Sequence, residues 1–306
     1  MAELTLDDLM FRPGLMQGQR ILITGGGTGL GKVMAEACLM LGAEVYICGR
    51  RGGVVEATAK ELTEAHKGQK GAGKCVGLAC DIRVPEAIAE MVDTVWADGG
   101  ALSGLVNNAA GNFISRTEDL SPRGFDAIAN IVFRGSFFVT LECGKRWLAE
   151  GEHASVVSIL TTWVWHGGPF TVPSAMSKAG LNVMTQSLAV EWGNRGVRFN
   201  AIAPGPFPTE GAWARLSPGQ TTEREKTDPT IPLNRTGEMR ELANLAVYLL
   251  DPGSAYVNGQ TIAIDGGSHL RGGGFNRLAE WGDAEWEAAR GAIRSANEKD
   301  RAQRTV

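Results

Sequence analysis

The chain has 306 residues, of which 43% are hydrophobic, and it contains 41 glycines. This composition supplies enough apolar material for a core and enough glycine for the many tight turns of an α/β protein. The formal net charge is −4, so no basic surface favours nucleic acid or an anionic membrane as a partner.

Cysteine usage and the two ends of the chain favour a reducing compartment. The five cysteines are an odd number without C-x-x-C spacing, which favours buried, reduced thiols over disulfides or a metal site. No signal peptide is visible, and we expect no stretch that is long and apolar enough to span a bilayer. The last residues, Arg304–Val306, are not a peroxisomal address. We therefore expect a cytoplasmic protein. The cysteines are Cys38, Cys48, Cys75, Cys80 and Cys143.

A glycine-rich stretch, Thr24–Gly31, follows a short apolar run and opens a segment with helical periodicity. Such a turn exposes backbone N–H groups at the positive end of a helix dipole, where a phosphate can bind. The dinucleotide fingerprint G-x-G-x-x-G fails at every register. The mononucleotide loop fits from Gly26 to Lys32, but Val33 stands where a hydroxyl must bind Mg²⁺. What remains is T-G-x-x-x-G-x-G, whose glycine positions are Gly25, Gly29 and Gly31.

Apolar strands then alternate with helical segments, and this alternation predicts an α/β fold. We expect a doubly wound (Rossmann) seven-stranded parallel sheet with helices on both faces. No internal repeat or boundary is visible, so residues 1–306 are interpreted as one domain. Its core spans 11–267, a proline-rich substrate loop spans 204–232, and a charged tail spans 271–306. After the strand at Ile21–Ile23, the expected strands are Ala43–Cys48, Lys74–Cys80, Leu102–Val106, Ala154–Ile159, Val197–Ala201 and Thr261–Asp265, and the expected helices include 54–66, 85–96, 121–149 and 174–192.

The residues after the strands favour a phosphorylated dinucleotide. An acidic residue after the second strand would accept from the ribose of NAD, whereas arginine accommodates the 2′-phosphate of NADP. Arg50 and Arg51 stand there without a carboxylate, so NADP(H) is the predicted cofactor. Two solvated surface arginines are the alternative, which applies more readily to Arg51. Asp81 is placed to bind the adenine, and Asn108 and Gly111 are expected along the cofactor.

The turn at Thr24–Gly31 resembles the cofactor turn of the short-chain dehydrogenases/reductases. That family carries Tyr-x-x-x-Lys, and the matching residues here are Ser174 and Lys178. An aliphatic hydroxyl is far too weak an acid to replace a phenol of pKa ~10. Thr161 takes the place of the usual active-site serine, and Val132 that of the usual asparagine. The cofactor-binding residues that the resemblance implies are Gly25, Gly27, Thr28, Gly29, Leu30, Gly31, Lys178, Pro204, Gly205, Pro206 and Thr209.

Four longer stretches resemble one branch of that family, the NADPH-dependent 2,4-dienoyl-CoA reductases, and the likeness runs from about Phe11 to the tail motif Gly274–Leu278. The resemblance implies a 2,4-dienoyl-CoA or another acyl-CoA as substrate, a place beside fatty acid β-oxidation, and a homotetramer. The four stretches are Gly25–Lys32, Asn107–Ser115, Pro173–Gly180 and Pro204–Ala212.

This branch can lack the tyrosine because of its chemistry. Hydride adds to the far end of a conjugated thioester, and the negative charge moves to the thioester oxygen. The site must therefore stabilise an enolate with hydrogen-bond donors. The resemblance assigns this role to the amide of Asn112; an asparagine that stabilises a turn is the alternative.

Two residues depart from that branch. Trp163 stands where mitochondrial-type members place a tyrosine, and an indole N–H donates a hydrogen bond but gives up no proton. Asn130 stands where an acidic residue is expected to position water. Asp265 either supplies the missing carboxylate or caps the turn after the last strand. His166 is a minor candidate for the acid.

The sequence therefore predicts an NADPH-dependent reductase of an unsaturated acyl-CoA. One alternative is a reductase of another enoyl or ketoacyl thioester or of an enone. The other is a protein that binds NADP(H) but has lost the proton route.

Overall fold

The computed structural model describes residues 4–209, 228–273 and 275–304. The chain divides into two compact units, residues 1–269 and 270–306, each treated by itself below. The interpretation of residues 1–306 as one domain stays a prediction. Most of the predicted substrate loop, the last three residues of Pro204–Ala212 and the first residue of Gly274–Leu278 lie outside the described residues.

A seven-stranded sheet forms the centre of the first unit, and its strand order is β3-β2-β1-β4-β5-β6-β7. Every strand pair is parallel, which confirms the predicted fold class. The order reverses between β1 and β4, and their carboxyl ends flank the crevice where such sheets bind ligands. The strands are β1 Arg20–Thr24, β2 Glu44–Gly49, β3 Cys75–Ala79, β4 Gly104–Asn107, β5 Ala154–Ile159, β6 Val197–Pro204 and β7 Thr261–Ile264.

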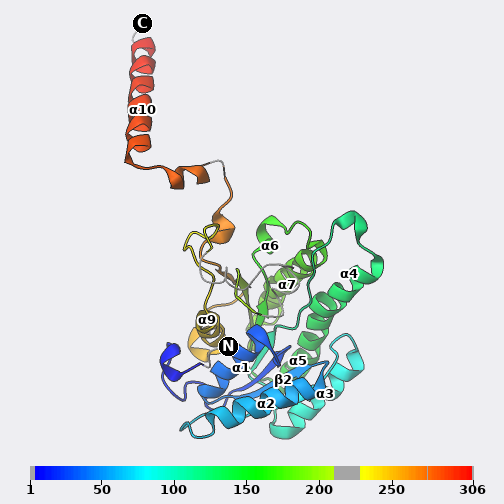
Figure 1. The fold of residues 1–306 in the computed structure, drawn as a ribbon. Helices are drawn as coiled ribbons and strands as arrows, with labels where there is room; N and C mark the ends of the chain where they lie inside the picture. The colour runs from blue at the N-terminus through cyan, green and yellow to red at the C-terminus, as the bar shows by residue number, and fades with distance from the viewer. Residues whose placement is uncertain (1–3, 210–227, 274, 305–306) are drawn as a thin grey trace. The chain divides into compact units, whose positions relative to one another are not determined.

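Helices cover both faces of this sheet (Figure 1). Strand side chains alternate between the faces: Ile21 and Ile23 pack in one core cluster with α1, α2 and α9, whereas Leu22 packs in the other with α3, α5 and α7. Helix α9 was not predicted from the sequence. The helices are α1 Gly29–Met40, α2 Gly52–His66, α3 Pro85–Gly99, α4 Pro122–Ala129, α5 Ser136–Glu150, α6 Trp163–His166, α7 Val172–Glu191 and α9 Met239–Leu250.

The long helix expected over 121–149 is present but not uniform. A π-helical segment, η3 (Asn130–Gly135), joins α4 to α5. Over Pro122–Glu150 this helix is long and apolar enough, by length and composition alone, to cross a membrane. The expectation that no stretch has this property was therefore wrong. Its α5 part contributes to the core, where Val139, Cys143 and Trp147 are fully buried.

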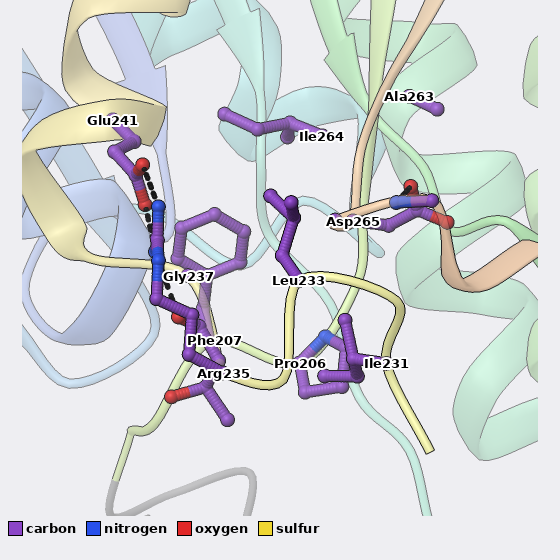
Figure 2. Close-up of a pocket in the computed structure, with 13 residues that line it drawn as sticks. Pro206, Phe207, Ile231, Leu233, Arg235, Gly237, Glu241, Ala263, Ile264 and Asp265 are labelled. Carbon is purple, nitrogen blue, oxygen red and sulfur yellow. Dashed lines mark hydrogen bonds and ion pairs between the residues drawn. The ribbon is translucent and has the colours of Figure 1, made fainter. Parts of the chain in front are cut away.

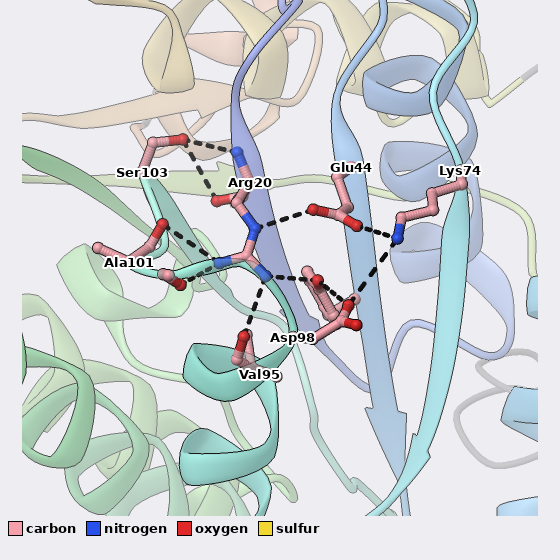
Figure 3. A network of polar contacts seen from close by, with 9 residues as sticks. Arg20, Glu44, Lys74, Val95, Asp98, Ala101 and Ser103 are labelled. Atoms are coloured by element: carbon pink, nitrogen blue, oxygen red, sulfur yellow. Dashed lines mark hydrogen bonds and ion pairs between the residues drawn. The ribbon is translucent and has the colours of Figure 1, made fainter.

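A buried polar network closes the opposite edge of the sheet, where the strands begin (Figure 3). Nε of Arg20 donates to Glu44 over 2.8 Å, and Nη2 donates to the Tyr46 hydroxyl over 2.5 Å. Tyr46 donates in turn to Asp98 over 2.6 Å, and Nζ of Lys74 lies 2.5 Å from Glu44. The guanidinium also donates to the backbone carbonyls of Val95 in α3 and of Gly100 directly after this helix. These contacts join the starts of β1 and β2 to the end of α3.

The second unit contains a short 3₁₀ helix, η8 (Asn276–Glu280), and a charged helix, α10 (Asp283–Arg304). The rings of Trp281 and Trp286 meet edge to face, with centroids 5.1 Å apart. The charged tail expected over 271–306 thus contains a charged helix that carries Trp286, whereas Trp281 lies between η8 and α10.

Candidate active site

The glycine-rich turn between β1 and α1 has the geometry of a phosphate cradle. Gly25 and Gly29 have φ values of +67° and +55°, which other residues rarely adopt. A side chain at Gly31 would lie 2.5 Å from Nδ2 of Asn108 and 2.5 Å from the Gly25 carbonyl oxygen. Thr28 precedes the helix in an extended conformation, and the first N–H groups of α1 have no acceptor within the helix. The cradle therefore fits the pyrophosphate of a dinucleotide.

Asn108 fixes this turn from the neighbouring strand. Its Nδ2 donates to the backbone oxygens of Thr24 and Gly25 over 2.9 and 3.2 Å. The Thr24 hydroxyl accepts from the N–H groups of Asn108 and Ala109, each over 3.0 Å. Asn108 was predicted to lie along the cofactor; its amide nitrogen holds the cradle instead of pointing freely at a ligand. The contribution of Thr24 was not foreseen.

The predicted adenosine end lies after β2 and β3. Arg50 is exposed, and the backbone oxygen of Arg51 accepts from the first turn of α2. Arg83 binds the Asp81 carboxylate through Nε over 2.9 Å and through Nη2 over 2.5 Å. Hydrogen bonds from Arg83 lower the pKa of Asp81, and the charge of Arg50 contributes to the same shift. Arg50 and Asp81 therefore lie within electrostatic reach of each other, and an adenine would share Asp81 with Arg83.

Lys178 lies deep in the site on α7. Only 5% of its surface is exposed, and its Nζ donates to the backbone oxygen of Ile159 at the end of β5. Burial lowers the pKa of this lysine to about 8. No carboxylate pairs with it in the described part of the chain. Ser174 is also buried, one turn earlier on the same helix.

Trp163 packs against the start of that helix. A side chain added at Gly168 would lie 2.8 Å from Cδ2 of the indole and 2.7 Å from the Thr171 hydroxyl, which shows how closely the three residues approach. Thr171 precedes α7 and accepts from the N–H of Ser174 over 3.0 Å. Thr161 lies between β5 and α6. The structure thus places Trp163 and Thr161 beside the helix that carries Ser174 and Lys178.

Asn112 follows β4 with a fixed side chain. Its Oδ1 accepts from the N–H of Phe113 over 2.9 Å, and Nδ2 has no partner among the described residues. The Ser115 N–H donates to the Phe170 oxygen over 2.9 Å and so ties this loop to the segment beside Trp163. Asn112 therefore presents a free amide donor, on a loop that is tied to the segment beside Trp163.

Gly111 lies against the end of α4 and the start of the π segment. A side chain at Gly111 would lie 3.3 Å from Cδ1 of Ile128 in α4 and 3.8 Å from Cδ1 of Ile131 in η3. Asn130 is partly buried at the junction of α4 and η3. π segments occur often at functional sites because they redirect a side chain from the helical pattern.

The loop after β6 closes the crevice from the other side. The Gly205 N–H donates to Ile264 over 3.0 Å, and Pro206 accepts from Gly237 over 3.0 Å. The methyl carbon of Thr209 lies 3.6 Å from the position that a side chain at Gly29 would occupy. Thr209 and the cofactor turn, far apart in sequence, are thus neighbours, as the predicted cofactor-binding set requires.

A cavity of about 260 Å³ lies under this loop (Figure 2). An ion pair between Arg235 and Glu241, 2.6 Å long, closes one side, and Phe207 and Leu233 provide apolar walls. The cavity includes Asp265 but neither Lys178 nor Ser174. Its lining also includes Pro206, a residue of the predicted cofactor-binding set.

Asp265 caps the turn after β7, the second of the two roles considered for it. Its carboxylate accepts from the Gly267 N–H over 3.0 Å and from the N–H and Nδ1 of His269 over 2.7 and 2.8 Å. The His269 ring stacks on Trp165 with centroids 4.8 Å apart. His269 was not predicted; its spacing of four residues from Asp265 was the available signal. His166, the minor candidate, is exposed, and its Nδ1 lies 2.8 Å from the Gly167 oxygen.

The five cysteines are buried and free, as predicted. Within the described residues, no group of three or more acidic, histidine or cysteine side chains could hold a metal ion.

Known proteins agree with this geometry. Residues 25–269 match the family model described as enoyl-(acyl carrier protein) reductase. A "probable 2,4-dienoyl-CoA reductase [(3E)-enoyl-CoA-producing]" of Caenorhabditis elegans is 40% identical over 298 residues, which are 96% of this chain and 95% of that protein. A "probable 2,4-dienoyl-CoA reductase [(2E)-enoyl-CoA-producing]" of Bacillus subtilis is 36% identical over 256 residues, 83% of this chain and 98% of that one.

Among solved structures, the RhlG/NADP active-site complex of Pseudomonas aeruginosa superposes with a TM-score of 0.74 at 26% identity, over 85% of this chain and all of that one (100%). The chain belongs to the short-chain dehydrogenase/reductase family, in its 2,4-dienoyl-CoA reductase-like branch. Members of this family are oxidoreductases that use a nicotinamide cofactor. The roles assigned to individual site residues stay predictions.

Proposed function

We propose that this protein is an NADPH-dependent reductase of an unsaturated acyl-CoA, most specifically a 2,4-dienoyl-CoA. Two observations carry the proposal: the Ser174–Lys178 helix turn is buried and contains no phenol, and the Asn112 side chain uses Oδ1 within its own loop while Nδ2 has no partner among the described residues. Reduction of a ketone would need an acid strong enough to protonate an alkoxide. Reduction of a conjugated thioester needs a donor for an enolate oxygen, and this site offers one.

Bound NADPH would supply the hydride. The N–H groups of the glycine-rich turn would hold its pyrophosphate, and the Lys178 ammonium would bind the ribose and contribute positive charge. Asn112 would donate to the thioester oxygen through Nδ2, because the Phe113 N–H already holds Oδ1. One such donor lowers the barrier by ~2.7–4 kcal/mol. We infer that Trp163 adds a second donor from its indole N–H.

The preference for NADPH rests on Arg50, which is exposed after β2 with no carboxylate competing for the ribose. A charge-assisted hydrogen bond is worth ~1.5–3 kcal/mol. Arg50→Ala should therefore weaken NADPH binding roughly 10- to 100-fold and leave NADH binding nearly unchanged. Titration of both cofactors by protein fluorescence measures this. Equal affinities in the parent protein would refute the assignment.

The substrate is tested by multiple-turnover oxidation of NADPH with a 2,4-dienoyl-CoA. A panel of enoyl-CoA, ketoacyl-CoA and enone substrates separates this activity from the reduction of another conjugated substrate on the same scaffold. Tight NADPH binding without turnover on any of them would favour a protein that keeps the cofactor site alone. The homotetramer, the cytoplasmic location and a role beside β-oxidation remain proposals from the family resemblance.

A further inference from the structure

The chemistry proposed above leaves one step without a residue. Hydride addition to a 2,4-dienoyl thioester gives a dienolate, which must take a proton on carbon. Protonation at the α carbon gives a 3-enoyl product, and protonation at the γ carbon gives a 2-enoyl product. Relatives named for each product exist. Neither Ser174 nor the indole of Trp163 can deliver this proton.

The Asp265–His269 pair has the geometry of an oriented acid–base group. Asp265 is buried, with 4% of its side chain exposed. Burial opposes its ionisation, but hydrogen bonds from His269 and Gly267 outweigh this and lower its pKa. The carboxylate therefore stays charged and holds Nδ1–H of His269 over 2.8 Å. This fixes the ring and leaves Nε2, which has no partner among the described residues, as the exchanging nitrogen.

Two contacts place the pair at the substrate crevice. A side chain at Gly205 would lie 2.6 Å from Cβ of Asp265, so the pair rests directly on the loop predicted to contact the cofactor. On its other side, the His269 ring lies on Trp165 of α6, the helix that also carries Trp163. The imidazole thus lies between the loop that contains Gly205 and helix α6. Its side chain is 20% exposed.

We infer that His269, oriented by Asp265 and Trp165, is the proton donor to the dienolate carbon. This inference rests on the proposed function. The Nε2–H bond of the imidazolium breaks, and a pair of dienolate π electrons forms the new C–H bond. The thioester carbonyl re-forms, the imidazole is left neutral, and solvent returns its proton. The residue thereby determines which carbon is protonated and hence the position of the remaining double bond.

The test uses the full-length protein, NADPH and a 2,4-dienoyl-CoA, with the product double bond located by NMR. His269→Gln should lower kcat about 10²- to 10⁴-fold, the usual contribution of a general acid. It should leave NADPH affinity and the melting temperature close to the parent's and should change the ratio of 2-enoyl to 3-enoyl product. Imidazole added to His269→Ala should restore part of the rate. His153→Gln, which alters an exposed histidine directly before β5, is the matched control and should behave as the parent.

Parental kcat and product ratio in His269→Gln would overturn the inference. So would a loss of rate that follows a loss of folding or NADPH binding without rescue by imidazole, because that pattern describes a structural cap. A parent protein that reduces no dienoyl-CoA would refute the proposed function instead, and this is established before any variant is compared.

Discussion

The two edges of the sheet treat a buried cation in opposite ways. At the edge where the strands begin, Arg20 is surrounded by Glu44, Tyr46 and carbonyl oxygens. Burial there opposes the charge, but the hydrogen bonds to Glu44 and Tyr46 raise the arginine pKa. At the edge where the strands end, Lys178 is equally buried with one carbonyl acceptor, and its pKa falls to about 8.

This difference distinguishes a charge that stabilises the fold from a charge that is available to a ligand. At Arg20 the chain itself supplies the counter-charge, because an unpaired buried ion costs several kcal/mol. The Lys178 ammonium can donate further hydrogen bonds to a ligand, and so can the amide of Asn112. Unsatisfied polar groups at the carboxyl edge therefore indicate where a cofactor and substrate complete the protein.

The largest effect should come from disrupting the Arg20 network at the edge where the strands begin. Arg20→Met removes one member of a buried network, leaves the Tyr46 hydroxyl without its donor and leaves Glu44 with Lys74 alone. We expect the free energy of unfolding to fall by about 3–5 kcal/mol. Urea unfolding measures this, with Lys74→Met, which removes a half-exposed partner of Glu44, as the milder control. A network of no structural value would leave both variants as stable as the parent.

The next largest effect is expected at Asn112, at the edge where the strands end. Asn112→Ala should lower kcat ~10²- to 10³-fold, the value of one oxyanion donor, with little change in stability. Asn112→Asp is the sharper variant, because it keeps the acceptor for the Phe113 N–H but removes the donor. Steady-state kinetics should show a comparable loss in both. An aspartate variant as active as the parent would mean that the side chain only stabilises the loop.

A third prediction concerns pH. The pKa of Lys178 is lowered from 10.5 to about 8, so between these values the unfolded chain binds more protons than the folded one. Stability from this group therefore rises with pH between about 8 and 10.5, by a few kcal/mol at most. Over the same rise above pH 8 the ammonium is lost, and NADPH affinity should fall. Lys178→Met should remove both dependences, and urea unfolding with cofactor titration from pH 7 to 10.5 measures them. If parent and variant show the same pH slopes, the lysine is not the titrating group.

The smallest effect is expected at Trp163. If its indole shares the enolate oxygen with Asn112, Trp163→Phe should lower kcat, because the shape is mostly kept and the N–H donor is lost. Trp163→Tyr should keep or raise the rate. Should the residue only line the pocket, the two variants would have equal kcat and differ in substrate preference alone.

The edge where the strands end could be predicted from the sequence far better than the edge where they begin. The turn at Thr24–Gly31, Ser174 and Lys178 are local patterns, and each is set by backbone geometry or helical spacing that a single stretch reveals. The partners of Arg20 and the contact of Thr209 with Gly29 join segments far apart in the chain. No periodicity carries that information. His269 was missed because its pairing with Asp265 depends on the turn between them.

The π segment at Asn130–Gly135 has a consequence of its own. An i→i+5 turn contains one residue more than an α-helical turn, and each residue of an α-helix turns the chain by about 100°. The phase of α4 relative to α5 therefore depends on a single surplus residue. Deleting one residue there would restore a regular helix and rotate Ile128 away from Gly111, whereas α5 would keep its place in the core. The π segment thus adds one residue to the helix, and the approach of Ile128 to Gly111 depends on that residue.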